Sequence, residues 1–304
     1  MLKKNKILIA GGTGFIGYHL AKKCLQLNWS VDSISSSFPN KKKKLNKVNY
    51  LRLDISKKNN LFKKLSKEYD YVVNLAGYVD HSNKVKTMKS HFNGCKNLAN
   101  FFLKSKIKKF IQIGSSIEYG KIKSPQKESH KISRKNFSVY GTAKLLSTKY
   151  LLYLKKKFDF PSVILRLYLV YGPYQDINRI IPITITNSLK NNKFDCSTGN
   201  QFRDFLYIDD LIGAIIKTLK KKNLSGEIIN VGSGKPIRIK SLIKNICNLA
   251  KGGDPQFGKL SLRKDEIYKL YPSILKSKQL LNWKPSIPLV KGLKKTIFYY
   301  KKNK

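Results

Sequence analysis

Tyr140 and Lys144 are the residues whose types and spacing point most directly to chemistry. They lie four residues apart in a segment that predicts a helix, so their side chains share one helix face. An ammonium beside a phenol stabilises the phenolate, the form that takes up a proton. A hydroxyl from Ser115 or Ser116, at the end of a predicted strand, would hydrogen-bond the same substrate oxygen. This set suits interconversion of a carbonyl and an alcohol, although a Tyr-x-x-x-Lys spacing also arises by chance on helices with a solvated lysine.

A glycine-rich turn near the N-terminus predicts a binding site for a dinucleotide. Residues 11–17 read Gly-Gly-Thr-Gly-Phe-Ile-Gly and fit G-x-G-x-x-G from Gly12 or G-x-x-G-x-x-G from Gly11. The turn follows a short apolar strand at 7–10 and precedes a helix at 18–27. Such glycines permit a tight turn, let the backbone approach a pyrophosphate, and let the helix lie close to the strand. An ordinary flexible turn is the alternative, but the strand-turn-helix context favours dinucleotide binding.

Strand-like and helix-like segments alternate through the first half of the chain. The predicted strands are 7–10, 29–35, 50–55, 71–77, 110–116 and 163–167, and the clearest helices are 18–27, 91–105 and 138–157. This α/β alternation predicts a Rossmann-type doubly wound parallel sheet with its site at the carboxyl ends of the strands. Beyond Gly172 the pattern changes to mixed helices and short strands. We therefore expect an NAD(P)-binding Rossmann domain at 1–172 and a smaller mixed α/β substrate lobe at 173–304, with segments that return to the Rossmann sheet.

The composition is strongly basic. The chain has 62 Lys and Arg against 17 Asp and Glu, a net charge of +45. Such a field attracts nucleic acids and anionic membrane surfaces. The excess is nearly all lysine spread along the chain, however, whereas arginine suits bidentate contacts with phosphate and bases. We expect a solvated lysine surface that attracts anionic substrates, and no specific nucleic-acid binding.

Several other classes are disfavoured by the sequence. No stretch approaches the roughly 20 apolar residues that span a bilayer, and the first strand begins too early for a cleaved signal peptide. The four cysteines are far apart and form no C-x-x-C pair, which favours a reduced, cytoplasmic protein. His81, His91 and His130 match no metal-ligand spacing, so we expect surface or loop positions and no metal site.

Taken together, these motifs resemble the extended short-chain dehydrogenase/reductase family, in its branch of NAD-dependent nucleotide-sugar epimerases and dehydratases. The resemblance covers nearly the whole chain. It rests on the glycine turn, Asp54-Ile55, Asn74-Leu75-Ala76-Gly77, Gly-Ser-Ser-Ile-Glu-Tyr-Gly at 114–120, Tyr140 to Lys144, Val-Tyr-Gly-Pro at 170–173, and Gln-Phe-Arg-Asp-Phe at 201–205. It implies an enzyme of nucleotide-sugar metabolism, with a role in polysaccharide or O-antigen biosynthesis.

The resemblance also assigns roles to individual residues. It implies that Ser115 is the catalytic hydroxyl, Tyr140 the acid/base, and Lys144 its partner and a ribose contact. The implied cofactor contacts are Gly11, Gly14, Phe15, Ile16, Gly17, Asp54, Ile55, Leu75, Ala76, Gly77, Tyr140, Lys144 and Tyr168. The implied substrate contacts are Ser116, Arg203 and Arg263, where the two guanidinium groups would hold the diphosphate of a nucleotide-sugar.

Departures from the family pattern narrow the expected reaction. Dehydratases carry an Asp-Glu pair directly after the catalytic hydroxyl, where this chain has Ser116 and Ile117. Glu118 comes one residue late and would point to the other face of an extended segment. Leu169 stands where many epimerases have asparagine. We expect reduction of a 4-keto-6-deoxy nucleotide-sugar first and a nucleotide-sugar 4-epimerase second. A non-catalytic dinucleotide-binding or RNA-associated protein is the alternative from another class.

The expected cofactor depends on the end of the second strand. NAD-binding proteins place an acid there for the ribose hydroxyls. Asp32 lies inside the predicted strand, and its end falls at Ser35-Ser36-Ser37, soon followed by Lys41 to Lys44. Hydroxyls and lysines could accept a 2′-phosphate, so NADP(H) is favoured over NAD(H), unless Asp32 itself is the acid.

The resemblance also implies a homodimer, formed through the helix that carries Tyr140. Leu145, Leu152 and Tyr153 would then lie on the outer face of this helix. Core packing within one chain explains these three residues equally well.

Overall fold

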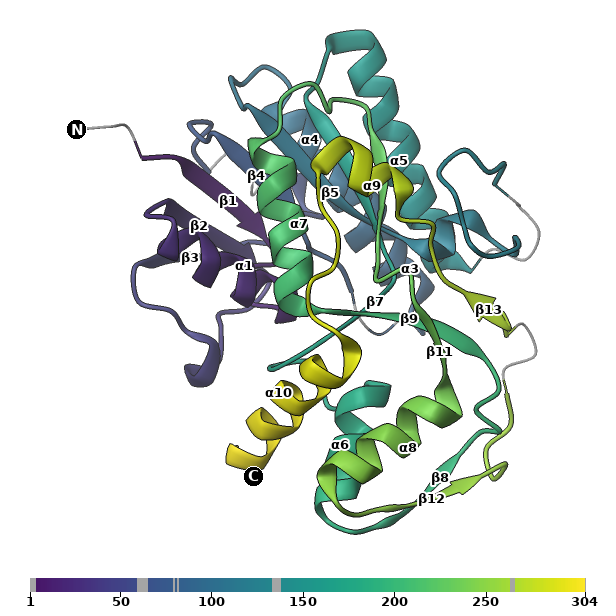
Figure 1. The fold of residues 1–304 in the computed structure, drawn as a ribbon. Coiled ribbons are helices and arrows are strands. Elements are labelled where there is room, and N and C mark those ends of the chain that lie inside the picture. The colour runs from purple at the N-terminus through teal and green to yellow at the C-terminus, as the bar shows by residue number, and fades with distance from the viewer. Residues whose placement is uncertain are drawn as a thin grey trace. The chain divides into compact units, whose positions relative to one another are not determined.

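The computed structural model describes residues 4–58, 65–78, 80, 82–132, 138–262 and 266–303 (Figure 1). The chain divides into two compact units. The first unit comprises Met1–Gly120, Phe137–Leu167 and Ile212–Ile229, and the second comprises Lys121–Asn136, Tyr168–Leu211 and Asn230–Lys304.

A seven-stranded sheet forms the centre of the first unit, in the order β10-β6-β5-β4-β1-β2-β3. Its strands in chain order are β1 (Lys6–Ala10), β2 (Ser30–Ser35), β3 (Val48–Arg52), β4 (Tyr71–Asn74), β5 (Lys109–Ser115), β6 (Ser162–Leu167) and β10 (Ile228–Val231). The neighbouring strands from β3 to β6 pair in parallel. The predicted Rossmann-type fold is thereby confirmed, with β3 ending at Arg52 rather than near Asp54.

Apart from the edge strand β3, the sheet is buried on both faces, as its apolar strands require. One face packs against α4 (Gly94–Phe102) and α5 (Val139–Phe158). That layer of the core contains Leu8, Ala10, Val72, Phe110 and Ile164 from the strands and Cys95, Leu98, Phe102, Leu151 and Leu154 from the helices. The opposite face is covered by α1 (Phe15–Gln26) and α7 (Ile208–Lys220), the latter in front of the sheet in Figure 1.

The helix expected at 91–105 begins earlier and is interrupted. It consists of α3 (Lys84–Met88), a π-helical segment Lys89–Asn93, and α4. A π-helical turn carries one residue more than an α-helical turn and therefore rotates the side chains that follow it. The prediction missed this segment because a single-residue insertion leaves no recognisable change in hydrophobic periodicity.

Among its described residues, the second unit contains smaller sheets and four further helices. The strands β7 (Leu169–Tyr171), β9 (Phe202–Tyr207), β11 (Pro236–Arg238) and β13 (Lys269–Leu270) form one sheet, and β8 (Lys193–Cys196) pairs with β12 (Asp254–Phe257). The helices are α6 (Ile180–Leu189), α8 (Ile239–Ala250), α9 (Leu275–Leu281) and α10 (Leu289–Lys302).

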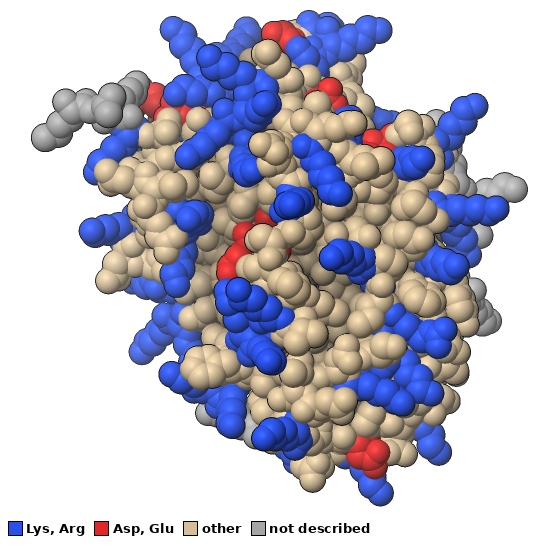
Figure 2. Space-filling model, in the orientation of Figure 1, with Lys and Arg blue, Asp and Glu red and all other residues tan. Residues whose placement is uncertain are grey.

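Lysine and arginine side chains are scattered over the face shown in Figure 2, among a few carboxylates, and do not gather into one stripe. All four cysteines are buried and free. None of the described helices is both long and apolar enough to cross a bilayer.

Asp32 is part of the core of the first unit. Its side chain accepts hydrogen bonds from the Tyr69 hydroxyl at 2.5 Å and from Asn49 Nδ2 at 3.2 Å. The Lys6 ammonium lies 3.9 Å away. Because Asp32 lies three residues before the end of β2 and already has these partners, it holds strands and loops together inside the fold.

Replacing Tyr69→Phe should therefore lower the free energy of unfolding by about 1–3 kcal/mol, because a buried carboxylate oxygen loses its donor. Urea denaturation measures the effect. Tyr78→Phe is the matched control, since the Tyr78 hydroxyl contacts Asp80 at an exposed position, and its effect should stay within about 0.5 kcal/mol. Equal losses in the two variants would contradict this account of Asp32.

Candidate active site

Lys144 and Tyr140 lie on the first two turns of α5, beside the end of β5. The helix begins after Ser138, whose hydroxyl accepts a hydrogen bond from Gly141 N at 3.1 Å. Lys144 is 5% exposed, and its Nζ donates to the Ile113 carbonyl at 2.7 Å. The same Nζ lies 5.8 Å from the centre of the Tyr140 ring. A buried ammonium is thus fixed next to the phenol, as the four-residue spacing predicts.

Ser115 is the last residue of β5, two residues beyond the carbonyl that holds Lys144. Its Oγ accepts a hydrogen bond from Ile117 N at 3.4 Å, which leaves the hydroxyl hydrogen available for another acceptor. Ser116 is buried and begins a 3-10 turn that runs to Tyr119. The fold therefore brings Ser115, Lys144 and Tyr140 to the same end of the sheet.

The expectation for Glu118 is wrong. Residues Ser116–Tyr119 form a 3-10 turn rather than an extended segment, and the Glu118 side chain is fully buried. Its carboxylate accepts hydrogen bonds from Ser115 N, Thr148 Oγ1 and Arg166 Nε. That it does not serve as the glutamate of the dehydratases stays a prediction.

His91 was not expected near the site, and the expectation of a surface or loop position for it is wrong. It is 6% exposed within the π-helical segment, and its ring contacts the Tyr140 ring edge to face, with centroids 4.9 Å apart. Its Nε2 lies 3.2 Å from the Tyr78 carbonyl and must donate to it, because a carbonyl only accepts. A side chain at Gly77 would clash with this ring. His91 therefore packs against the catalytic candidate and the turn after β4.

The expectation of no metal site also named His81 and His130. His81 lies outside the described residues, and His130 Nδ1 accepts from Lys127 N at 3.3 Å within a turn. Among the described residues, no three His, Cys, Asp or Glu side chains are grouped so that they could hold a metal ion.

The glycine turn has the geometry of a cradle for a phosphate group. Gly14 is the N-cap of α1 and has no side chain to occupy the backbone N–H groups of the first helical turn. An added Cβ at Gly17 would lie 2.3 Å from the Gly11 carbonyl oxygen. The helix thus approaches the turn as closely as backbone allows, and Phe15 and Ile16 form its first turn. Free amides at a helix N-terminus suit a pyrophosphate.

The turn after β4 meets the glycine turn. Leu75 N donates to the Ala10 carbonyl at 2.8 Å, and Ala76 N donates to Asn74 Oδ1 at 3.2 Å. Gly11 has a φ of +82°, and a Cβ there would lie 2.8 Å from Ala76 N. Parallel pairing of β1 with β4 thereby brings the candidate cofactor residues of both turns, Gly77 included, to one edge of the sheet.

Asp54 and Ile55 follow β3 in a turn of their own. The Asp54 side chain accepts from Ser56 N at 2.9 Å. The Ile55 side chain is 5% exposed and packs directly on Gly94 of α4. Ile55 therefore contributes to the core, and a contact of these two residues with an adenine stays a prediction.

Three residues predicted from the resemblance belong to the second unit. The Tyr168 hydroxyl donates to Gln126 Oε1 at 2.7 Å. The Arg203 guanidinium pairs with Glu266 and donates to the Phe202 carbonyl. Arg263 lies outside the described residues.

The three residues expected at a dimer contact differ in exposure. Leu145 is 8% exposed, and Leu152 packs against the core of its own chain. Tyr153 and Phe158 of the same helix are exposed. Core packing therefore accounts for the two leucines, and the homodimer stays a prediction.

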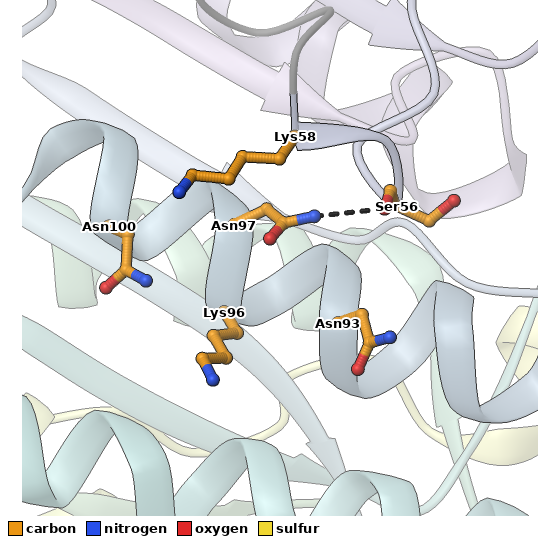
Figure 3. Close-up of a pocket in the computed structure, with 6 residues that line it drawn as sticks. All are labelled: Ser56, Lys58, Asn93, Lys96, Asn97 and Asn100. Atoms are coloured by element: carbon orange, nitrogen blue, oxygen red, sulfur yellow. Dashed lines mark hydrogen bonds between the residues drawn. The ribbon is translucent and has the colours of Figure 1, made fainter.

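A separate hollow of about 370 Å³ lies between the outer face of α4 and the turn after β3 (Figure 3). It is lined by Ser56, Lys58, Asn93, Lys96, Asn97 and Asn100. Asn97 spans it by donating to the carbonyls of Ile55 and Ser56, both at 3.0 Å. None of the candidate catalytic residues lines this hollow.

Comparison with known proteins decides the family. The model of the NAD dependent epimerase/dehydratase family matches residues 7–232. The chain belongs to this family. The resemblance drawn from its motifs is thereby confirmed, and the chain is an enzyme of the extended short-chain dehydrogenase/reductase type.

Relatives of the chain act on nucleotide-sugars according to their names. A Methanocaldococcus jannaschii protein named "Putative UDP-glucose 4-epimerase" is 31% identical over 98% of this chain and 99% of its own length. Human dTDP-D-glucose 4,6-dehydratase is 28% identical over 98% of this chain and 90% of its own length. The structure of Bacillus cereus UDP-glucuronic acid 4-epimerase with UDP-glucuronic acid and NAD has a TM-score of 0.88 and 27% identity, covering 98% of this chain and all of that one.

Gly17 and Gly14 predict different effects of an added methyl group on stability. Gly17→Ala should lower both the melting temperature and the affinity for NAD, because its Cβ would overlap the backbone of Gly11 and Gly12. Gly14→Ala should lower the melting temperature less than Gly17→Ala, since its φ of −76° suits alanine and its Cβ would lie 3.3 Å from the Gly11 carbonyl oxygen. It should still weaken NAD binding by about tenfold, or about 1.4 kcal/mol, by blocking approach of the pyrophosphate.

Thermal unfolding and calorimetric titration with NAD measure these two properties separately. Unchanged NAD affinity in both variants would show that the dinucleotide does not bind at this turn.

Proposed function

We propose that this enzyme transfers a hydride to and from C4 of the sugar of a nucleotide-sugar, and that it is a nucleotide-sugar 4-epimerase. The observation that carries the proposal is the buried Lys144 ammonium, held by the Ile113 carbonyl beside the Tyr140 ring. Full-length similarity to proteins named as 4-epimerases supports the choice of reaction.

A bound nicotinamide dinucleotide supplies the hydride acceptor and donor for this reaction. Tyr140 removes the proton of the sugar 4-hydroxyl as the carbonyl forms and returns it when the alcohol is restored. The Lys144 charge stabilises the phenolate of Tyr140 during this exchange. The free hydrogen of the Ser115 hydroxyl donates to the same sugar oxygen, on which negative charge develops.

The nucleotide part of the substrate needs cations for its diphosphate. We propose that Arg203 and Arg263 supply them, that Ser116 contacts the sugar, and that Tyr168 contacts the cofactor. A carboxylate, Glu266, already pairs with the Arg203 guanidinium, which is the kind of anionic partner that a phosphate oxygen would replace.

Reduction of a 4-keto-6-deoxy nucleotide-sugar is the second candidate, because it needs the same three residues and a supplied hydride. The side chains at the end of β2 favour this reductase, because they suit NADP(H) as the source of the hydride. Ser35 ends the strand, Ser36 and Ser37 follow, and Arg52 Nε donates to the Ser36 carbonyl at 3.1 Å. Asp32 is engaged inside the core, and the Ser35 hydroxyl donates to the Ile34 carbonyl and accepts from Thr13 N. Ser36, Ser37 and the Arg52 guanidinium are therefore the groups that would hold the 2′-phosphate of NADP(H).

An assay with a panel of nucleotide-sugars and both dinucleotides separates the two reactions. An epimerase interconverts two nucleotide-sugars with no net change in nicotinamide absorbance. A reductase oxidises NADPH in proportion to a 4-keto nucleotide-sugar. If no member of the panel reacts in either way, the proposed function is wrong.

Tyr140→Phe tests the catalytic assignment. Turnover should fall by about 100-fold to 10,000-fold, because the proton acceptor is lost, while dinucleotide affinity is kept. Tyr150→Phe is the matched control on the same helix, since its hydroxyl contacts Asn100 at the surface, and its turnover should be unchanged. A Tyr140→Phe protein that keeps its biological role would favour a non-catalytic dinucleotide-binding or RNA-associated protein.

Arg52→Gln tests the cofactor preference. If the reaction is the 4-keto reduction, the wild-type protein should bind NADP(H) about tenfold more tightly than NAD(H), and the substitution should remove this difference by taking away a charge-assisted contact. The 4-epimerase proposed first requires no such preference. Lys106→Gln, at an exposed lysine between α4 and β5, removes the same charge and should leave the preference intact. Titration of each protein with the two dinucleotides gives the ratio. Tighter binding of NAD(H) by the wild type would overturn the preference and with it the case for a reductase.

A further inference from the structure

The Glu118 carboxylate is fully buried and receives three hydrogen bonds from three different elements. Ser115 N at the end of β5 donates to its Oε1 at 2.8 Å. Its Oε2 accepts from Thr148 Oγ1 of α5 at 2.7 Å and from Arg166 Nε of β6 at 3.0 Å. This carboxylate therefore joins the strand end that carries Ser115 to the helix that carries Tyr140 and Lys144.

A glycine on β5 leaves room for the Glu118 carboxylate. Gly114 pairs with Arg166 across β5 and β6, and a Cβ at Gly114 would lie 2.5 Å from Glu118 Oε1. The Arg166 guanidinium is 4.4 Å from the centre of the Tyr119 ring and balances the carboxylate charge. A buried ion pair is tolerated only when its remaining polar atoms are also bonded, which Ser115 and Thr148 accomplish here.

The hydrogen bonds at Ser115 determine whether its hydroxyl can donate or accept a hydrogen bond with a substrate. Its N–H is held by Glu118, and its Oγ accepts from Ile117 N. Ser115 Oγ also accepts from the N–H of Glu118, and this bond together with the one from Ser115 N to the Glu118 carboxylate forms a capping box at the start of the 3-10 turn. Because the N–H groups of Ile117 and Glu118 both take up Oγ as an acceptor, its hydroxyl can act toward a substrate by donating its hydrogen.

We infer that Glu118 is a positioning residue for catalysis, which holds Ser115 in the orientation to donate to the substrate oxygen and in register with α5. The inference rests on the proposed function, because it assigns Glu118 a role only through Ser115. Glu118 itself does not touch the substrate. Thr148 lies one helical turn beyond Lys144, so the carboxylate and the Lys144–Ile113 bond fix the same helix to the same strand at two points.

Two charge-neutral pairs of substitutions test the inference without leaving a buried charge unpaired. Glu118→Gln with Arg166→Met keeps a side-chain acceptor for Ser115 N. Glu118→Met with Arg166→Met removes that acceptor at nearly the same volume. The second pair should turn over about 10-fold to 100-fold more slowly than the first, as expected for a misplaced catalytic group. The two double variants should have the same KM within about twofold, and the same dinucleotide affinity within about twofold, because Glu118 contributes to orientation rather than binding.

Addition of Ser115→Ala to both pairs separates positioning from a general effect on the fold. If Glu118 acts through Ser115, the two triple variants should have equal turnover, since the group that Glu118 positions is gone. The inference is overturned if the difference between the pairs persists in the Ser115→Ala background, or if the two pairs are equally active with Ser115 present.

A second measurement needs no substrate. Hydrogen exchange of the Ser115 amide should be at least about tenfold faster in the Glu118→Met pair than in the Glu118→Gln pair, because its acceptor is lost. Equal exchange would also overturn the inference. Failure of the wild-type protein to react with any nucleotide-sugar would instead count against the proposed function, and the exchange result would still decide whether Glu118 holds Ser115.

Discussion

The hydrogen bond from the buried Lys144 ammonium to the Ile113 carbonyl is the interaction on which the rest of the site depends. It places a positive charge inside the first unit and compensates part of its desolvation. It also fixes α5 against β5, so that Tyr140 and Ser115 extend from two elements with a defined mutual position. Together with the Thr148–Glu118 bond, this contact gives the tyrosine on the helix and the serine on the strand a common geometry.

Parallel pairing gives the site its second constraint. The turns after β1 and β4 meet because their strands are neighbours, and the glycines let the backbones touch where side chains would collide. Gly11 and Gly17 therefore serve the packing of the turn as well as the approach of a phosphate. The same constraint applies at Gly114, where a missing side chain makes room for the Glu118–Arg166 pair.

The motifs of the candidate site can be recognised in the sequence because they are local. The glycine turn, the strand ends and the Tyr140–Lys144 spacing depend on short stretches whose periodicity and turn residues are visible in the chain. Glu118 was mistaken for a residue of an extended segment, because a single 3-10 turn leaves no periodic signal. His91 was assigned to the surface for a related reason, since the π-helical segment that buries it against Tyr140 has no signature of its own.

By itself, the sequence determined the fold class, the family and the identity of the acid/base candidates, because strand and helix periodicity and motif spacing are properties of neighbouring residues. Only the tertiary structure decided which partners the buried charged side chains have. It placed Asp32 in the core with Tyr69, and it joined Glu118 to Arg166, which lies 48 positions further along the chain. The physical reason is that desolvation and compensation of a charge depend on groups brought together by folding, which no local pattern encodes.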